Sequence, residues 1–248
     1  MNFDIGINSF FRREITKIDN TLLPEGFNGD RRSVKACMQV VHDILNVMGA
    51  ASAKAQGVGN PMTSAEKLRN SDHIIYLLVD RDGNKSNGSV IGMLKMGWKR
   101  LYMFDEHEQR NEAMALCVLD FYIHESKHRM GYGKKLFDYM LQEEGVEPEK
   151  LAFDCPSENF LRFLQKHYNL THDIYQSNNF VVFSGFFNNS SQDKENRLKN
   201  AKNAHHCGIS SPKLSPCSTE NKLTFSGRHT AFKRVTTMGE IVQPSHLM

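Results

Sequence analysis

Several features that would place this chain in a special class of proteins are missing from its 248 residues. No apolar run approaches the roughly 20 residues that span a bilayer, so we expect no membrane span. The opening stretch MNFDIGINSFFRREI carries Asp4 ahead of a short, interrupted apolar segment, which is unlike a secretory signal peptide. We therefore expect a cytosolic protein.

Paired cysteines are missing as well. The five cysteines form no C-x-x-C pair and are odd in number: Cys37, Cys117, Cys155, Cys207 and Cys217. Neither a disulfide framework nor a zinc site is indicated by this spacing. We expect reduced thiols and no metal ion.

Charge is distributed unevenly along the chain, which is 40% hydrophobic and 24% charged and so long enough for one globular core. Lys and Arg number 22 against 24 Asp and Glu in residues 1–189, but 9 against 4 in residues 190–248. From Asn188 the chain is rich in Ser, Asn and Lys and poor in aliphatic residues, which predicts a disordered tail. A second interpretation is a basic arm that an acidic partner attracts, more weakly at high salt.

The first half of residues 1–189 predicts two helices and then antiparallel strands. RSVKACMQVVHDILNVMGAASAKAQ has apolar residues at helical spacing, with Gly49 where a helix could end or bend. TSAEKLRNS predicts a short helix whose capping box joins Thr63 and Glu66. HIIYLLVDRDGNKSNGSVIGMLKMGWKRLYMFD is typical of a strand, a turn at Asp82 and Gly83, a strand and a further strand segment.

The second half predicts a crossover between parallel strands. MALCVLDFYIHE is typical of a long central strand, a helix is expected over 131–144, and KLAFDCP is a short strand. A strand–helix–strand unit of this length implies a right-handed crossover between parallel neighbours. A helix in SENFLRFLQKHYNL, capped by Ser157, and a strand in NFVVFSGFF follow. We expect an α/β fold with a mixed sheet, antiparallel first and partly parallel later, flanked by helices.

The junction between strand and helix in FYIHESKHRMGYGKKLFDYMLQ carries Gly131 and Gly133. Free N–H groups and the positive end of the dipole at a helix start suit a phosphate, and glycine lets it come close. A nucleoside-triphosphate loop is excluded because His128 and Lys135 stand where it needs Gly and Ser or Thr. A dinucleotide fingerprint is excluded because Leu136 replaces its third glycine. The residues alone leave open a phosphate-bearing cofactor or a simple tight turn.

Four segments together resemble the α-tubulin N-acetyltransferase family over roughly residues 1–187: ASAKAQ (51–56), LCVLDFYIHES (116–126), GYGKKLFDYMLQ (131–142) and FDCPSENFLRFLQKHYNL (153–170). That family is similar in fold to the GCN5-related acetyltransferases, which implies parallel strands that splay apart at the cofactor site. The acetyl-CoA pyrophosphate loop of those enzymes begins with Gln or Arg, where this chain has His128. Because such loops act mainly through backbone N–H groups, we expect the departure to remove a side-chain contact and not the cofactor.

The resemblance implies acetylation of an α-tubulin lysine on the luminal loop of microtubules, by direct attack on acetyl-CoA in a ternary complex. Lysine, with a pKa of ~10.4, arrives protonated, so a group must accept its proton. The resemblance assigns that general base to Asp154. It also implies catalytic roles for Cys117, which relays a proton or only shapes the channel, and for Gln56, which orients the incoming lysine. From spacing alone, Asp154 is equally compatible with a turn, Cys117 with a buried small residue, and Gln56 with a solvated helix end.

The resemblance further implies two cofactor-binding segments, a strand edge with its loop and the helix opposite. The first comprises Phe121, Tyr122, Ile123, His124, Glu125, Ser126, Lys127, His128, Arg129, Met130, Gly131, Tyr132, Gly133 and Lys134. The second comprises Ser157, Glu158, Asn159, Phe160, Leu161, Arg162, Phe163, Leu164, Gln165 and Lys166. Lys134 and Lys166 either add charge near the phosphates or are ordinary solvated lysines. Lys95, Lys99 and Arg100 around Trp98 either meet acidic tubulin or form the solvent face of a hairpin.

Two alternatives stay open: an acetyltransferase that acts on another protein or a small amine, and a non-catalytic protein that binds and stabilises microtubules. We expect a catalytic domain over 1–189, a basic tail over 190–248 and a monomer. The expected partners are α-tubulin and microtubules, with no nucleic acid. The expected location is the cytoplasm and its microtubule cytoskeleton.

Overall fold

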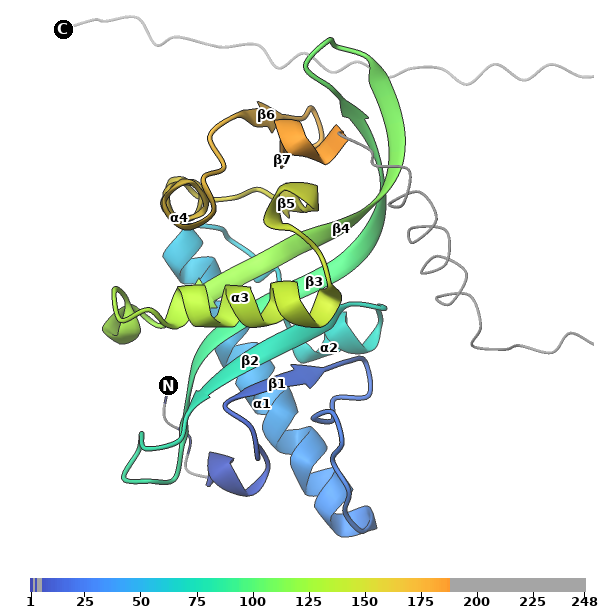
Figure 1. Ribbon diagram of the computed structural model, residues 1–248. Helices are drawn as coiled ribbons and strands as arrows, with labels where there is room; N and C mark the ends of the chain where they lie inside the picture. Colours follow the sequence, from blue (N-terminus) through green and yellow to red (C-terminus); the bar gives the residue numbers. More distant parts are fainter. Residues whose placement is uncertain (2, 4–5, 188–248) are drawn as a thin grey trace, which may run out of the picture. The chain divides into compact units, whose positions relative to one another are not determined.

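A single mixed sheet organises the protein, whose computed structural model describes residues 1, 3 and 6–187. Its seven strands in the described range lie in the order β1-β2-β3-β4-β5-β7-β6 (Figure 1). β4 and β5 are parallel, whereas the other neighbours are antiparallel. The predicted fold class, antiparallel first and partly parallel later, is confirmed.

The strands are β1 (Ile15–Ile18), β2 (Ile74–Asp80), β3 (Ser89–Phe104), β4 (Arg110–Ile123), β5 (Ala152–Asp154), β6 (Asp173–Tyr175) and β7 (Phe180–Phe183). The helices are α1 (Arg31–Gln56), α2 (Ala65–Arg69), α3 (Tyr132–Glu144) and α4 (Glu158–Tyr168). Short 3₁₀ turns lie at Ile7–Ser9, Glu125–Lys127, Pro148–Lys150 and Ser184–Phe187. The sequence did not predict β1 and β6, because strands of three or four residues are too short for an alternating pattern to show.

β3 is one strand of 16 residues, so the separate strand segment predicted before Phe104 is wrong. It pairs with β4 from Gly92 opposite Ile123 to Phe104 opposite Arg110. Gly97 lies inside this strand, and the ring of His73 packs on it, so that a Cβ there would lie 2.2 Å from His73 Cδ2. A long two-stranded ribbon therefore forms the middle of the sheet.

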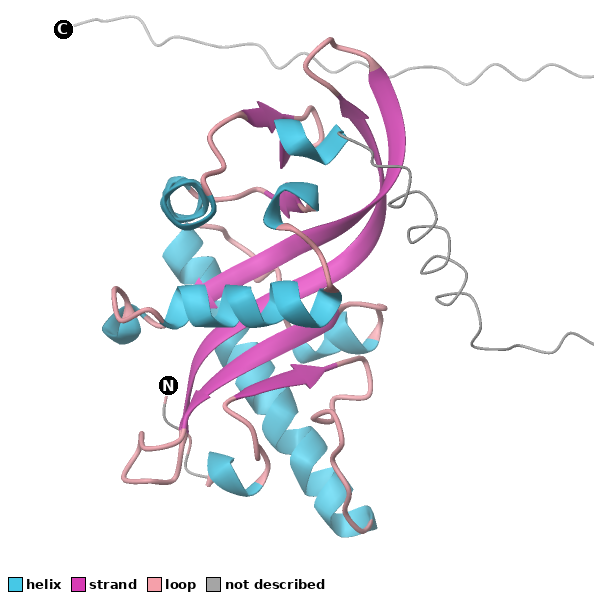
Figure 2. Ribbon diagram, in the orientation of Figure 1, coloured by secondary structure: helices cyan, strands magenta, loops and turns pink. Residues whose placement is uncertain are grey.

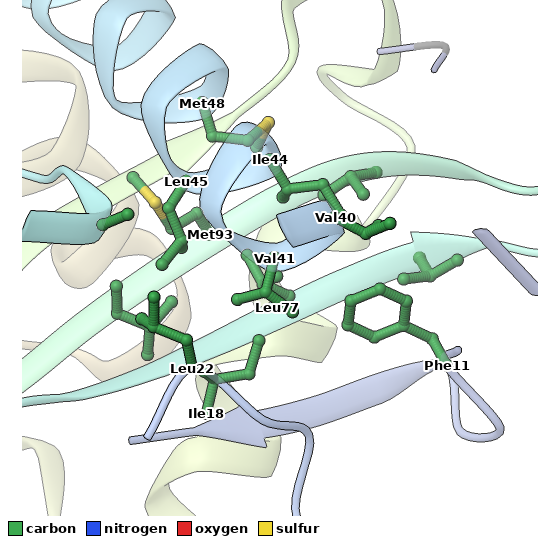
Figure 3. Packing of buried hydrophobic residues seen from close by; sticks show 14 of the residues in the cluster. Phe11, Ile18, Leu22, Val40, Val41, Ile44, Leu45, Met48, Leu77 and Met93 are labelled. Carbon is green, nitrogen blue, oxygen red and sulfur yellow. The ribbon is translucent and has the colours of Figure 1, made fainter. Parts of the chain in front are cut away.

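Helices cover both faces of the sheet, with α3 in front of the strands and α1 behind them in the view of Figure 2. Behind the sheet, α1 buries a row of apolar residues against Leu77 and Met93 (Figure 3). In front, α3 buries Leu136 and Phe137 in the cluster that holds Tyr76. Since both faces are covered, the inner strands read as continuous apolar runs, and burial of this surface is the main stabilising contribution.

Gly49 lies inside α1, which continues to Gln56 and is capped by Gly57, so of the two outcomes considered for Gly49, an end or a bend, the end is wrong. A Cβ on Gly49 would lie 1.9 Å from the carbonyl oxygen of Thr63. The glycine is needed because the loop that follows α1 returns against the helix. The capping box is also wrong in detail: Ser64 caps α2 by accepting from the N–H of Lys67.

No helix in the part of the chain that the structure describes is long and apolar enough to cross a bilayer. The predicted tail, 190–248, lies outside the described residues, so its disorder and the domain boundary at 189 stay predictions.

Gly49→Ala should destabilise the protein by about 1–3 kcal/mol, because its Cβ must push the Thr63 backbone away from α1. Gly59→Ala is the matched control, since a Cβ there meets no atom within 4 Å; it should change the free energy of unfolding by less than about 0.5 kcal/mol. Denaturant unfolding measures both. Equal stabilities for the two variants would contradict the close approach.

Candidate active site

A cleft opens where β4 and β5 part. These strands share only two residue pairs, Cys117 with Ala152 and Val118 with Phe153. β4 then continues to Ile123, whereas β5 ends at Asp154 and the chain turns into α4. A cavity of about 480 Å³ lies between the end of β4, the start of α3 and α4. β4 and β5 are therefore the parallel strands that were expected, from the family resemblance, to splay apart at the cofactor site.

The N-terminus of α3 faces this cavity without a capping side chain. α1, α2 and α4 are each capped by a side-chain oxygen, from Asp30, Ser64 and Ser157 respectively. At α3 the capping position is Gly131, in the left-handed region with φ 83°. The first N–H groups of α3 therefore have no partner among the described residues and, with the helix dipole, can bind an anionic group.

The cavity wall beside this helix end is apolar and aromatic. The rings of Phe121 and Phe160 lie with centroids 4.8 Å apart, and those of Phe160 and Phe163 are stacked at 6.0 Å. A Cβ on Gly133 would lie 3.6–3.7 Å from Phe121, Ile123 and Phe163, so a longer side chain there would enter the cavity. The site thus combines an anion-binding end with a wall suited to an uncharged chain, as acetyl-CoA requires.

Just over half of the predicted cofactor-binding residues line the cavity: Phe121, Tyr122, Ile123, Lys127, His128, Arg129, Gly131, Gly133, Lys134, Ser157, Asn159, Phe160 and Phe163. The others do not: His124, Glu125, Ser126, Met130, Tyr132, Glu158, Leu161, Arg162, Leu164, Gln165 and Lys166. The prediction covered two continuous segments, whereas a strand and a helix each turn only one face to a cavity, so only some residues of each segment can line it. It missed Ala55 and His167, which also line it.

Two cations on the cavity rim are held by carboxylates. Lys127 Nζ lies 2.8 Å from Asp80 Oδ2, and Lys134 Nζ lies 2.5 Å from Asp138 Oδ2. His128, the residue that departs from the motif, uses its Nε2 to contact the Ile123 carbonyl oxygen at 2.7 Å and so ties the loop to β4. Its side chain has a structural role here.

Asp154 ends β5 at the point where the strands part, and its side chain is half-buried. Burial raises the pKa of Asp154 above its ordinary value, and the charge of Asp120 adds to this effect. The cations of Lys99 and Lys95 act in the opposite direction without reversing the shift. A carboxylate with a raised pKa in a cleft fits a general base.

Cys117 is fully buried, and its Sγ lies 3.3 Å from the Ala115 carbonyl oxygen, to which it donates. Burial raises the pKa of the Cys117 thiol to about 12, so it is protonated at neutral pH. It packs in an apolar cluster with Leu119 and Phe180. A buried, protonated thiol is not a nucleophile, which agrees with direct attack on the thioester.

Gln56 lies at the C-terminal end of α1 and lines the cavity together with Ala55. Its Nε2 donates to Ser52 Oγ at 2.7 Å and to Asp120 Oδ1 at 3.0 Å. Asp120 in turn acts on the pKa of Asp154. The structure therefore brings Gln56, Cys117 and Asp154 into one neighbourhood.

The cationic cluster expected around Trp98 is divided by the alternation of β3. Lys95 is 5% exposed and donates to the Met62 carbonyl oxygen at 3.0 Å, so the solvent-face interpretation is wrong for it. Lys99 is half-buried on the same side, near Asp154 and Cys117. Arg100 is exposed and pairs with Glu112 at 3.5 Å.

Sequence reasoning missed four residues of this neighbourhood: Ser52, Thr63, His73 and Asp120. His73 is half-buried against Gly97, and burial lowers its pKa to about 4, so its ring is neutral at pH 7. Only Asp120 carried a usable signal, because it is an acidic residue inside the apolar run of β4. The hydroxyls of Ser52 and Thr63 carry no signal in a linear sequence.

The family model and the relatives that this chain resembles all describe one kind of acetyltransferase. The sequence model of the family described as "GNAT acetyltransferase, Mec-17" matches residues 3–212. An alpha-tubulin N-acetyltransferase of Aedes aegypti is 49% identical over 190 residues, covering 76% of this chain and 69% of the relative. Relatives of the same description from Anopheles gambiae and Trichoplax adhaerens are 48% and 46% identical, covering 78% and 76% of this chain and 40% and 83% of those proteins. The chain spans only part of the length of each.

Gly131→Val should raise the Kd of acetyl-CoA about tenfold or more, because a β-branched residue cannot keep φ at 83° and the N–H groups would turn from the phosphates. Gly145→Val is the matched control. Gly145 ends the same helix with φ 62°, and a Cβ at either glycine meets no atom within 4 Å. Calorimetry should show unchanged acetyl-CoA binding for Gly145→Val; similar Kd values for both variants would refute the phosphate site.

Proposed function

Because the chain belongs to the Mec-17 family of GNAT acetyltransferases, we propose that it transfers the acetyl group of acetyl-CoA to a lysine side chain of α-tubulin, on the luminal loop of microtubules. The resemblance noted from the sequence motifs is thereby confirmed. The observation that carries the mechanism is Asp154, a half-buried carboxylate with a raised pKa at the end of β5, three residues before Ser157, which lines a cavity that suits acetyl-CoA.

The chain's own groups divide the reaction between them. The uncapped end of α3 binds the pyrophosphate, and Phe121 and Phe160 flank the pantetheine chain. Asp154 takes the proton of the lysine ammonium, and the neutral amine attacks the thioester carbonyl carbon. The new N–C bond replaces the C–S bond, CoA leaves as the thiolate, and the thiolate takes the second proton that the nitrogen loses as it becomes an amide. Direct attack needs only alignment, which supports a ternary complex without an enzyme-bound acetyl group.

The partner and the location follow from the same proposal. α-Tubulin in microtubules is the substrate, and the protein acts in the cytoplasm as a monomer. Incubation with labelled acetyl-CoA and either microtubules or a panel of free amines, followed by mapping of the label, tests this. We expect the label on a luminal α-tubulin lysine; label on other amines alone would favour the alternative acetyltransferase.

Asp154→Asn should lower turnover by ~10²–10⁴-fold, because the amide keeps the shape of the carboxyl group and cannot accept a proton. The Kd of acetyl-CoA should stay at the native value, since Asp154 does not line the cofactor cavity. Steady-state kinetics and calorimetry measure the two effects. A folded variant with native turnover from pH 6 to 9 would rule out Asp154 as the base. An inactive variant that still stabilises microtubules would instead show the non-catalytic role.

Lys99→Met should move the acidic limb of the pH–rate profile to higher pH. The rate rises with pH as Asp154 loses its proton, and the Lys99 cation lowers the pKa of Asp154, so its removal raises that pKa. Arg100→Met is the matched control, because this exposed neighbour pairs with Glu112 and does not act on Asp154. Coincident profiles for the two variants would contradict the coupling.

A further inference from the structure

A buried carboxylate that no catalytic role described above uses lies beside Gln56. Asp120 is 5% exposed and accepts three side-chain hydrogen bonds. Ser52 Oγ donates to its Oδ1 at 2.7 Å and Thr63 Oγ1 to its Oδ2 at 2.6 Å. Gln56 Nε2 donates to Oδ1 at 3.0 Å. Three donors on one buried carboxylate hold the members of this network in one arrangement.

The network fixes which way the Gln56 amide faces. A carboxylate can only accept hydrogen bonds, so the amide atom next to Asp120 must be the nitrogen. Ser52 has one hydroxyl proton and gives it to Asp120, so its oxygen is left to accept from the Gln56 amide, at 2.7 Å. The two acceptors of the amide nitrogen lie only 2.7 Å from each other, so they share one of its N–H groups. The carbonyl oxygen, Oε1, has no donor among the described residues, and Gln56 lines the cavity.

Asp120 is itself held by its place in the sheet and by the loop that follows α1. It lies on β4 directly opposite Lys95 on β3, next to the register shift that follows Lys95. The loop after α1 brings Thr63 to it, and that loop can lie so close only because Gly49 has no side chain. The position of the carboxylate is therefore set by packing and not by Gln56.

We propose that Asp120 is a positioning residue, which with Ser52 turns the Gln56 carbonyl oxygen toward the acceptor amine so that it can accept an N–H of the incoming lysine. The inference rests on the proposed acetyl transfer. A carbonyl acceptor at this place aligns the amine while Asp154 removes its proton. A reversed amide would present N–H groups to an ammonium and repel it.

Double-mutant kinetics test whether Asp120 acts through Gln56. Asp120→Ala and Gln56→Ala should each lower kcat by about 10–100-fold, the loss typical of a misplaced reactant. The KM for acetyl-CoA should be unchanged in Asp120→Ala, since Asp120 does not line the cofactor cavity. The double variant should be no slower than Gln56→Ala alone, because Asp120 has nothing left to orient. Asp120→Asn should recover most of kcat, since its amide oxygen can accept the same two bonds. The proposal is overturned if the losses of kcat in the two single variants multiply in the double variant. It is also overturned if Asp120→Asn is as slow as Asp120→Ala.

Two controls separate positioning from general destabilisation. Tyr76→Phe removes another buried hydrogen bond to a carboxylate, from Tyr76 OH to Glu144 at 2.5 Å, and should cost stability without changing kcat. If Asp120→Ala does not fold, Ser52→Ala replaces it, because it removes the other acceptor of the Gln56 amide. Ser52→Ala should lower kcat in the native protein but not in a protein that already carries Gln56→Ala. If the two losses of kcat multiply in the combined variant, the proposal is refuted.

A spectroscopic measurement keeps this inference distinct from the proposed reaction. In the native protein the side-chain amide proton of Gln56 that faces Asp120 and Ser52 should exchange slowly with solvent in NMR spectra, and in Asp120→Ala it should become fast. Fast exchange of this proton in the native protein would overturn the inference even if acetylation is observed. Slow exchange in a protein that acetylates no amine would support the amide's position and refute the proposed function.

Discussion

The parting of β4 and β5 after two residue pairs is the constraint on which the rest of the site depends. β4 has 14 residues and β5 only three, so the long strand overhangs the short one. The overhang leaves the aromatic face of β4 open to α4, and it places the start of α3 at the mouth of the cleft. α3 is fixed there because it buries Leu136, Phe137 and Met140 on the sheet. One difference in strand length therefore determines the positions of the anion-binding helix end, the apolar wall and Asp154.

Burying charge beside that cleft is costly, and the structure offsets the cost locally. Two carboxylates, Asp120 and Asp154, lie among two cations, Lys95 and Lys99, so the group is balanced in charge. Asp120 is satisfied by three donors and Lys95 by a backbone carbonyl oxygen. The side chain of Asp154 has no hydrogen-bond donor among the described residues. The cations of Lys99 and Lys95 offset its burial only in part, so the pKa of Asp154 stays raised, which is why we propose it as the group that takes up a proton.

The sequence predicted the elements that carry strong periodicity or cap signals and failed where a tertiary contact decides the outcome. The helix over 131–144 and the Ser157 cap of α4 were predicted from such signals and are confirmed. Gly49 was misjudged because nothing in α1 reveals that the Thr63 backbone packs on it. Lys95 was placed on a surface because its burial depends on a loop 33 residues away. The predicted site residues came from family motifs, whereas Asp120 and its hydroxyl partners become visible only when α1, the loop after it and β4 meet.

Proton transfer in this cleft is favoured by burial acting on both partners. A lysine ammonium and a carboxylate that meet in a partly desolvated site both lose hydration, which lowers the pKa of the amine and raises that of Asp154. The nearby cations of Lys95 and Lys99 further disfavour the ammonium form of the incoming lysine. The two pKa values thus move toward each other, as in other sites where environment sets the direction of proton transfer. Cys117 undergoes the same desolvation, which outweighs the Lys99 cation and the Lys99 backbone hydrogen bond that favour its thiolate. Burial therefore keeps the thiol protonated, which supports Asp154 as the proposed base.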